Sequence, residues 1–312
     1  MNSPMAGFAQ DQGVLTCDGV PLPAIAADAG TPVHVYSGAL IDDRYRRLDA
    51  ALSGVPHRLH YALKANSTLA IVRRLRDLGA RADANSGGEL ETALRAGFAP
   101  GDIVMTGVGK THAELERAIG LGVGAINVES PGEMLRIERI AAAQGAVARV
   151  AVRINPDIDA GSHRHISTGH RATKFGMSAS DATMLLREMS RHPWMHVVGL
   201  HTHVGSQITR LEPFTQAIDA LVSLAASLAD EGIRVEHVDV GGGLGIAYEP
   251  AQPVVSVEDY ASTLIRAIAG TGLQLIVEPG RWIVGPAGVL LTQVVDLKPG
   301  PGAGSESLAK KS

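Results

Sequence analysis

The sequence predicts an α/β fold, a parallel (β/α)8 TIM barrel, accompanied by a remnant of a second, mostly β domain. Short apolar runs alternate with longer helical patterns from about residue 59 onward, and the alternation repeats eight times. Eight strand-then-helix units over roughly 220 residues favour a closed barrel over a doubly wound sheet. The hydrophobic fraction of 45% and the charged fraction of 19% are typical of a globular enzyme. An open α/β sheet remains the alternative.

The expected barrel elements follow in order along the chain. Helix-capping residues such as Ser67, Thr111, Ser130 and Ser256 precede several of the helical patterns. The strand candidates are Leu59–Leu63, Arg81–Asn85, Ile103–Thr106, Ala125–Val128, Arg149–Ile154, Val197–His201, His237–Val240 and Gln274–Val277. The helix candidates are Thr68–Leu78, Gly88–Ala96, His112–Leu121, Pro131–Gln144, Ala179–Ser190, Glu212–Asp230 and Val257–Ala269.

Two segments lie outside the barrel pattern. Gly13–Leu22 contains two apolar runs joined by Asp18-Gly19, a good hairpin turn, and Val289–Leu297 is rich in β-forming residues. Both are interpreted as strands of the second domain, and the hairpin is a possible partner of the later strand. The expected domains are an N-terminal segment (1–35), the barrel (36–285), the first strand of an incomplete C-terminal β domain (286–298) and a disordered tail (299–312).

Composition limits the class of partner. The net charge is −4, the pI is near 6.3 and no long basic run occurs, so we expect small molecules or other protein chains as partners, and neither nucleic acid nor membrane. A single cysteine, Cys17, excludes an internal disulfide. The first ten residues lack the features of a signal peptide, and no apolar run approaches a membrane span, so a cytoplasmic location is expected.

Polar residues gather where the expected strands end, which is where such barrels carry chemistry. Lys64 follows an apolar strand and is suited to a Schiff base with a carbonyl compound. A lysine that merely reaches solvent at the barrel rim is the alternative. Glu278 ends another apolar strand, so it should be partly buried and need a cationic partner, either a protonated ring nitrogen or Arg281.

Glycines after the seventh and eighth strands predict a phosphate site. Gly241, Gly242 and Gly243 would let backbone N–H groups approach an anion, and Gly280-Arg281 would complete the cradle. A tight turn that requires positive φ is the alternative. The spacing does not fit a dinucleotide fingerprint.

Histidines occur in two places. His201 and His203 alternate on one strand, but no compact set of carboxylates and histidines on other strands was evident, so no metal site is predicted. His203 is interpreted as a ring stacked on a flat cofactor, and His201 as a core residue. The segment 163–176, which carries His163, His165 and His170, is either a solvated loop or a lid.

These motifs together resemble the fold-type III pyridoxal-phosphate (PLP) decarboxylases, an alanine racemase-like barrel family, over about residues 14–298. The Asn155-Pro156-Asp157 motif and the segments 165–169 and 174–176 favour the diaminopimelate decarboxylase branch. The other segments that carry the resemblance are Tyr61–Asn66, His203–Gln207, Asp239–Gly245 and Glu278–Arg281.

The resemblance implies PLP bound covalently to Lys64, with His203 stacked on its ring and Asp83 nearby. It implies that Glu278 pairs with the ring nitrogen, and that Arg281 also lies on the substrate side. The phosphate would be held by Ser206, Gly241, Gly242, Gly243, Gly280 and Arg281.

The implied activity is decarboxylation of meso-2,6-diaminopimelate to L-lysine, in a homodimer with shared active sites. In the family a β domain after the barrel supplies a cysteine proton donor and a tyrosine to the partner's site. Cys17 does not occupy that donor's position. We therefore expect little decarboxylase activity from the 312-residue chain alone, and an aggregation-prone C-terminal end. The alternatives are a decarboxylase of another basic amino acid, a non-catalytic PLP-binding barrel and a Schiff-base aldolase.

Overall fold

A computed structural model describes residues 7–156, 158 and 175–298. Within it the chain divides into two compact units, residues 38–287 and a smaller unit that joins the N-terminal residues up to Ser37 to those from Gly288 onward. The segment 163–174, which includes His163, His165 and His170, lies outside the described residues.

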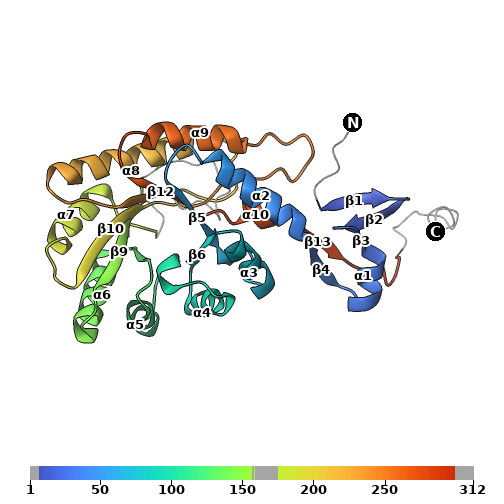
Figure 1. Cartoon of the computed structure of the whole chain (residues 1–312), viewed down its shortest axis with the longest axis horizontal. Helices are drawn as coiled ribbons and strands as arrows, with labels where there is room; N and C mark the ends of the chain where they lie inside the picture. Colours follow the sequence, from blue (N-terminus) through green and yellow to red (C-terminus); the bar gives the residue numbers. More distant parts are fainter. Residues whose placement is uncertain (1–6, 157, 159–174, 299–312) are drawn as a thin grey trace. The chain divides into compact units, whose positions relative to one another are not determined.

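The larger unit contains a closed barrel of eight parallel strands among the described residues (Figure 1). Its strands pair in the order β10-β11-β12-β5-β6-β7-β8-β9. The predicted barrel is therefore confirmed, and the open sheet is excluded. The strands are β5 (His57–Ala62), β6 (Arg81–Ala84), β7 (Ile103–Met105), β8 (Ala125–Val128), β9 (Ala148–Arg153), β10 (Met195–His201), β11 (His237–Asp239) and β12 (Gln274–Val277).

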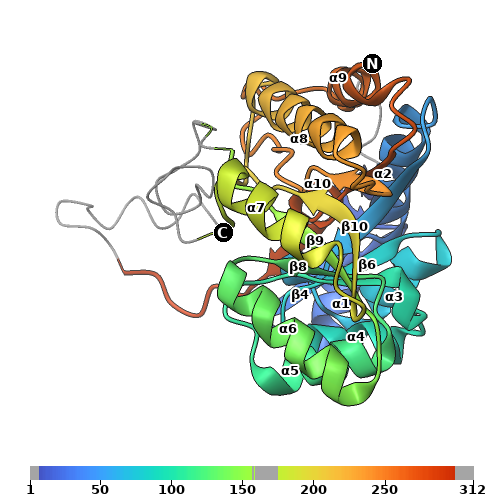
Figure 2. The ribbon, with the colours of Figure 1, turned by 90° about the vertical axis from the view of Figure 1, so that its left-hand side faces the viewer.

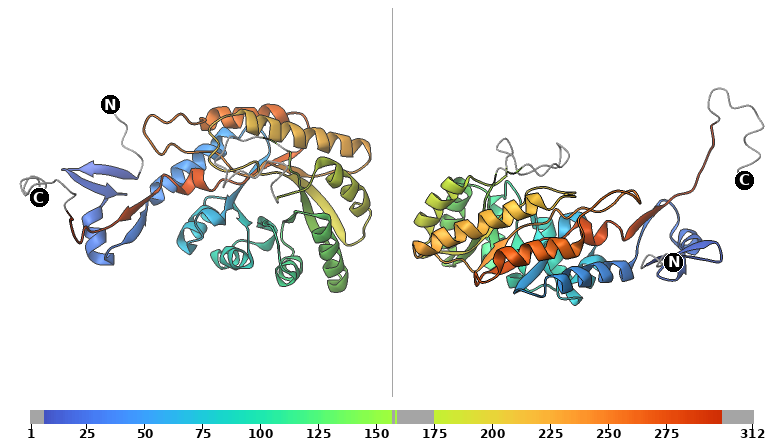
Figure 3. Two further views of the ribbon diagram at one scale, coloured as in Figure 1. Left: turned by 180° about the vertical axis from the view of Figure 1, so that it is seen from behind. Right: turned by 90° about the horizontal axis from the view of Figure 1, so that it is seen from above.

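Helices surround the strands (Figure 2), and α8 and α9 run side by side (Figure 3). At that contact the rings of Phe214 and Tyr260 meet edge to face, with centroids 4.8 Å apart. The helices are α2 (Gly38–Ala51), α3 (Leu69–Asp77), α4 (Gly87–Ala96), α5 (His112–Leu121), α6 (Pro131–Gln144), α7 (Ala179–Met189), α8 (Glu212–Asp230), α9 (Val257–Ile268) and α10 (Arg281–Val284), with the short 3-10 turns η1 (Leu63–Ala65) and η2 (Pro100–Asp102).

Local sequence explains most of the helix starts. Thr111 and Glu114 form a reciprocal capping box at α5, and the Ser130 and Ser256 hydroxyls accept backbone N–H groups at α6 and α9. Ser67 was wrongly interpreted as a cap. The N-cap of α3 is Thr68, and it forms no side-chain cap hydrogen bond.

The smaller unit contains two short sheets. β1 (Phe8–Asp11), β2 (Val14–Cys17) and β3 (Val20–Pro21) form an antiparallel meander, and Asp18-Gly19, both at positive φ, make the predicted turn between β2 and β3. The second sheet pairs β4 (Val33–Tyr36) with β13 (Gly288–Leu291), and α1 (Leu22–Ala29) lies between the two sheets in sequence.

The expected strand Val289–Leu297 is wrong in two respects. The observed strand ends at Leu291, and its partner is β4 and not the hairpin at Gly13–Leu22. The segment Val33–Tyr36 carries two valines and a tyrosine, which suit a strand. Its short length in a proline-containing stretch hid it from the sequence pattern.

Two histidines at the N-terminal part of the barrel lie buried in their neutral forms. Burial lowers the pKa of His60 to about 3 and that of His237 to about 4. In the unfolded chain both would have a pKa of about 6.5 and would bind a proton below that pH. Their contribution to the free energy of unfolding is therefore fully present above about pH 6.5. As the pH falls below this value the unfolded chain binds protons that the folded chain does not, so the contribution is lost progressively toward the folded-state pKa values of about 4 and 3.

We therefore expect His60→Gln to flatten the pH dependence of the free energy of unfolding. Between about pH 5.5 and pH 4.5 the wild-type slope should exceed the variant's slope by about 1.4 kcal/mol per pH unit, because close to one proton is bound in the unfolded chain and not in the folded chain. Urea unfolding across this range measures both slopes. His112→Gln, on the exposed surface of α5, controls for loss of a histidine. Equal slopes for wild type and His60→Gln would contradict the assignment.

Candidate active site

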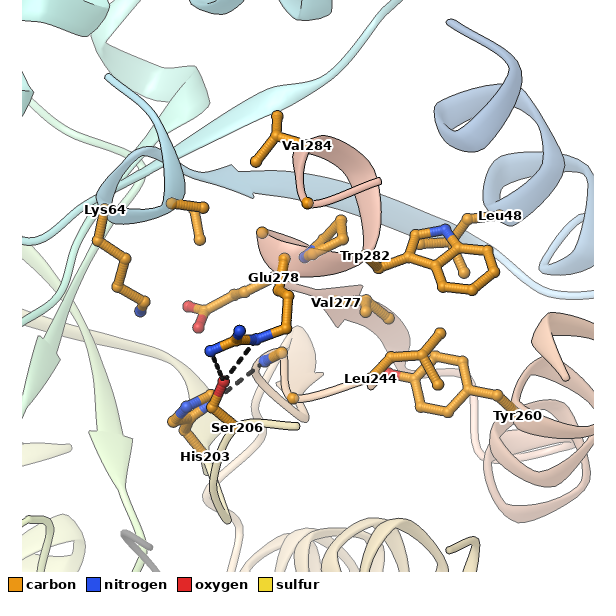
Figure 4. Close-up of a pocket in the computed structure, with 18 of the residues that line it drawn as sticks. Leu48, Lys64, His203, Ser206, Leu244, Tyr260, Val277, Glu278, Trp282 and Val284 are labelled. Carbon is orange, nitrogen blue, oxygen red and sulfur yellow. Dashed lines mark hydrogen bonds between the residues drawn. The ribbon is translucent and has the colours of Figure 1, made fainter. Parts of the chain in front are cut away.

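A cavity of about 460 Å³ opens at the C-terminal ends of the barrel strands. Figure 4 shows the side chains of Lys64, Glu278, His203 and Ser206 on one side of it, and the apolar residues Leu244 and Trp282 with Tyr260 on the other. The sequence-predicted residues that line it are Lys64, His203, Ser206, Gly242, Gly243, Glu278, Gly280 and Arg281. Asp83 and Gly241 do not line the cavity but contact residues that do.

Lys64 lies in η1, directly after β5, and its side chain is 43% exposed to the cavity. Its Nζ atom donates to Asp83 Oδ2 at 3.3 Å and to Asn85 Oδ1 at 3.4 Å. Desolvation opposes the charged amine, but the carboxylates of Asp83 and Glu278 outweigh it and raise the pKa of Lys64. Asn85 was not singled out in the sequence, although it ends the second strand candidate.

Asp83 is fully buried on β6. Its Oδ2 atom also accepts from Asn85 Nδ2 at 3.0 Å. Burial first, and the nearby negative charge of Glu278 second, raise the pKa of Asp83, while Lys64 lowers it. Asp83 therefore fixes the position of the Lys64 amine and does not itself face the cavity.

Glu278 is buried at the end of β12, and neither of its carboxylate oxygens has a hydrogen-bond partner among the described residues. Burial raises its pKa, but the positive fields of His201 and Lys64 prevail, so the pKa of Glu278 lies below its usual value. Buried carboxylates are normally bonded. The His201 Nε2 atom approaches Glu278 Oε1 at 3.5 Å, an ion-pair contact that is too long for a good hydrogen bond, so the carboxylate can still accept a hydrogen bond from a cationic group in the cavity.

Arg281 is not the partner of Glu278, although the sequence allowed that pairing. Its Nε and Nη2 atoms donate to Ser206 Oγ at 3.4 and 3.3 Å, and its Nη1 atom donates to the Tyr248 hydroxyl. Arg281 is the first residue of α10, immediately after Gly280, and its side chain extends from there to Ser206 in the segment that follows β10. Tyr248 was missed because nothing in its sequence neighbourhood marks it.

Gly242 and Gly243 allow backbone segments to approach one another closely at the predicted phosphate site. A Cβ on Gly242 would lie 2.3 Å from the Glu278 carbonyl oxygen, and one on Gly243 would lie 2.6 Å from that of Gly205. Gly241 and Gly243 also have positive φ, which disfavours other residues. The turn interpretation is thus correct. The N–H group of Gly241 donates to Asp239 Oδ1 at 2.8 Å and therefore is not free to bind an anion.

His203 lies beside this loop, and its Nδ1 atom accepts the Gly242 backbone N–H at 3.1 Å. Burial first, and then the positive charges of Lys64 and Arg153, hold the pKa of His203 well below its usual value. The ring is therefore neutral near pH 7.

The expectation that no carboxylates gather around His201 is wrong. His201, Asp239 and Glu278, all buried, each place a ligand atom within 4.8 Å of the others. Barrel closure produces this set, because His201 and Asp239 are paired in register on β10 and β11. Burial and the adjacent Glu278 raise the pKa of Asp239 well above its usual value, which favours its protonated form. Since metal binding needs deprotonated ligands, this shift disfavours a cation here.

Within the described part of the chain, no helix is both long and apolar enough to cross a membrane.

Comparison with known proteins identifies the family. Residues 39–285 match the model of the pyridoxal binding domain of pyridoxal-dependent decarboxylases. The chain is 45% identical to diaminopimelate decarboxylase of Pseudomonas fluorescens, over 94% of this chain and 71% of the relative. It is 40% identical to that of Aquifex aeolicus, over 92% of this chain and 68% of the relative.

Solved structures give the same result. Diaminopimelate decarboxylase of Helicobacter pylori complexed with L-lysine superimposes with a TM-score of 0.87 and 38% identity, over 89% of this chain and 70% of that chain. The enzyme of M. jannaschii in co-complex with L-lysine gives 0.88 and 34%, over 94% and 71%. These matches favour a PLP enzyme over the aldolase alternative. The chain belongs to the pyridoxal-dependent decarboxylases and, among them, to the diaminopimelate decarboxylase family.

Proposed function

We propose that this chain forms the PLP-binding barrel of a lyase that converts meso-2,6-diaminopimelate to L-lysine in lysine biosynthesis. The observation that carries the proposal is that the buried Glu278 carboxylate, whose oxygens accept no hydrogen bond from the described residues, lines the same cavity as Lys64. Release of CO2 from meso-diaminopimelate by the barrel supplied with the complete β domain, with lysine as the product, tests it. Residues 36–285 would be the barrel domain, and residues 1–35 and 286–298 would belong to the β domain.

The residues present fit PLP. Its protonated ring nitrogen is a cation that Glu278 can accept, and its phosphate is an anion that suits Arg281, Ser206 and the N–H groups of Gly243 and Gly280. The N–H groups of Gly241 and Gly242 donate to Asp239 and His203, so these two glycines would serve the site by allowing close approach of the backbone. Its aldehyde can react with the amine of Lys64. When bound, PLP supplies an electron sink for the pair of electrons left by departing CO2.

The chain's own residues would each have one task. Lys64 anchors the cofactor, and Asp83 holds the Lys64 amine in position through the 3.3 Å hydrogen bond. The neutral ring of His203 is fixed by Gly242 and offers an apolar face for stacking on a flat ring. Glu278 keeps a proton on the ring nitrogen, and Arg281 contributes a guanidinium to the phosphate and to the substrate carboxylate.

The glycine cradle yields a direct test. Gly242→Ala should weaken PLP binding by at least about ten-fold, because the new methyl group forces the loop away from the Glu278 carbonyl oxygen, which lies 2.3 Å from the ideal Cβ position. Equilibrium titration followed by absorbance measures the dissociation constant. Gly132→Ala, at a position where a Cβ meets no atom within 4 Å, is the matched control. Equal affinity of wild type and Gly242→Ala would remove the loop from the cofactor site.

We also propose a homodimer and a cytoplasmic location. The support for the dimer is the family pattern, in which the β domain of one subunit contributes to the site of the other. Sedimentation at several protein concentrations tests it. The sole cysteine, Cys17, is free and buried, as is common in reducing compartments.

A further inference from the structure

A second cavity, of about 180 Å³, lies at the opposite end of the barrel. Its cationic lining comes from strand beginnings: Arg58 is the second residue of β5, Arg81 the first of β6 and Arg149 the second of β9. Lys64 and Glu278 come after strand ends. Because the strands are parallel, the barrel interior separates the two cavities. The proposed function does not use the cavity at the strand beginnings.

Two of the three arginines are already paired. Arg149 Nη2 contacts Glu236 Oε2 at 2.8 Å, and Arg81 Nη2 contacts Asp102 Oδ1 at 3.2 Å. Arg58 forms no hydrogen bond or ion pair with any residue that the structure describes. The carboxylates of Glu236 and Asp102 therefore balance two of the three guanidinium charges, and the charge of Arg58 is left without an ion-pair partner in the described part of the chain.

Arg58 is also electrostatically unfavourable where it lies. Burial, followed by the positive charge of Arg81, lowers its pKa, and the acids Asp102 and Glu236 offset this only in part. An anion in the cavity would raise the pKa of Arg58 again, because its negative charge would stabilise the guanidinium cation.

His60 adds an unsatisfied donor to the same cavity. Its side chain is only 3% exposed, and neither ring nitrogen has a hydrogen-bond partner among the described residues. Since its ring is neutral, one nitrogen carries a proton to donate and the other can accept. Such a buried group requires a partner that is not a described side chain.

The space lies where small residues precede or begin the strands β7 and β8. Gly101, Gly124 and Ala125 line the cavity with Val104. Its volume of about 180 Å³ compares with about 30 Å³ for a water molecule in the liquid. It therefore has room for a tetrahedral ion with a few waters.

We propose that this cavity binds a small inorganic oxyanion of the charge and size of phosphate. Arg58 is its principal partner, Arg81 and Arg149 add positive charge at the rim, and His60 donates a hydrogen bond from within. The site is independent of PLP and of substrate.

Titration calorimetry with inorganic phosphate tests the proposal on the 312-residue chain. Wild type should bind phosphate at a site that Arg58→Gln weakens by about ten-fold or more, the loss expected for a charge-assisted contact. Arg58→Lys keeps the charge and places little demand on folding, and it should weaken binding by a smaller factor. Circular dichroism establishes that each variant is folded.

Two controls locate the site. Arg139→Gln removes an exposed charge from α6 and should leave binding unchanged. Arg281→Gln removes the guanidinium at the other end of the barrel, and the Arg58-dependent binding should survive it. The proposal is overturned if wild type binds no phosphate, if Arg58→Gln and Arg58→Lys both bind as wild type does, or if Arg281→Gln alone abolishes all binding.

Discussion

Lys64→Ala should lose covalently held PLP completely. Lys64 is the one lysine lining the cavity among the described residues, and its Nζ atom is held toward that cavity by Asp83 and Asn85. No imine can form without an amine. The near-visible absorbance of the PLP imine, and its loss on treatment with borohydride, measure the effect in protein reconstituted with excess cofactor.

Lys64→Arg is the matched control for charge. It keeps a cation beside Asp83, so it should remain folded and retain PLP only noncovalently. Lys298→Ala, outside the barrel, should behave as wild type. A reducible adduct of unchanged stoichiometry in Lys64→Ala would show that another amine holds the cofactor.

In a complete, active version of the enzyme, Glu278→Gln should bind PLP yet lose decarboxylation by about 100-fold or more, a loss typical of removing one group that stabilises developing charge. The carboxylate has no hydrogen-bond partner among the described residues, so its negative charge is available to the ring nitrogen. The amide has nearly the same shape but cannot hold a proton on that nitrogen. Cofactor content and CO2 release from meso-diaminopimelate, compared with wild type, separate the two effects.

Glu258→Gln, on the exposed face of α9, controls for the loss of a carboxylate. Turnover per bound cofactor that is equal in Glu278→Gln and wild type would reject the pairing with the ring nitrogen. Loss of the cofactor itself would assign Glu278 to binding and not to the chemical step.

The sequence predicted the barrel well because its signal is periodic. Each strand candidate overlaps an observed strand, and helices such as α5, α6 and α8 begin and end at the expected residues. Strand ends converge in any parallel barrel, so the gathering of Lys64, His203 and Glu278 followed from the pattern alone. Strand position and residue type alone suggested a Schiff-base lysine and a carboxylate for a ring nitrogen, and the resemblance to known decarboxylases identified the cofactor as PLP.

Features that depend on three-dimensional closure were not predictable. The proximity of His201, Asp239 and Glu278 depends on the register between β10, β11 and β12. Arg281 turned toward Ser206, 75 residues away, since the helix start and not sequence distance sets its direction. The short strand β4 was missed because four residues carry too little periodic signal.

The central claim, that Lys64 carries the cofactor of this barrel, is tested most directly by locating the attachment. Wild-type chain reconstituted with PLP is reduced with borohydride and digested, and the modified peptide is identified by mass spectrometry. The account predicts one pyridoxyl group per chain, on the peptide that contains Lys64. Modification of Lys110, which is buried beside Glu133, or of any lysine other than Lys64, would contradict it.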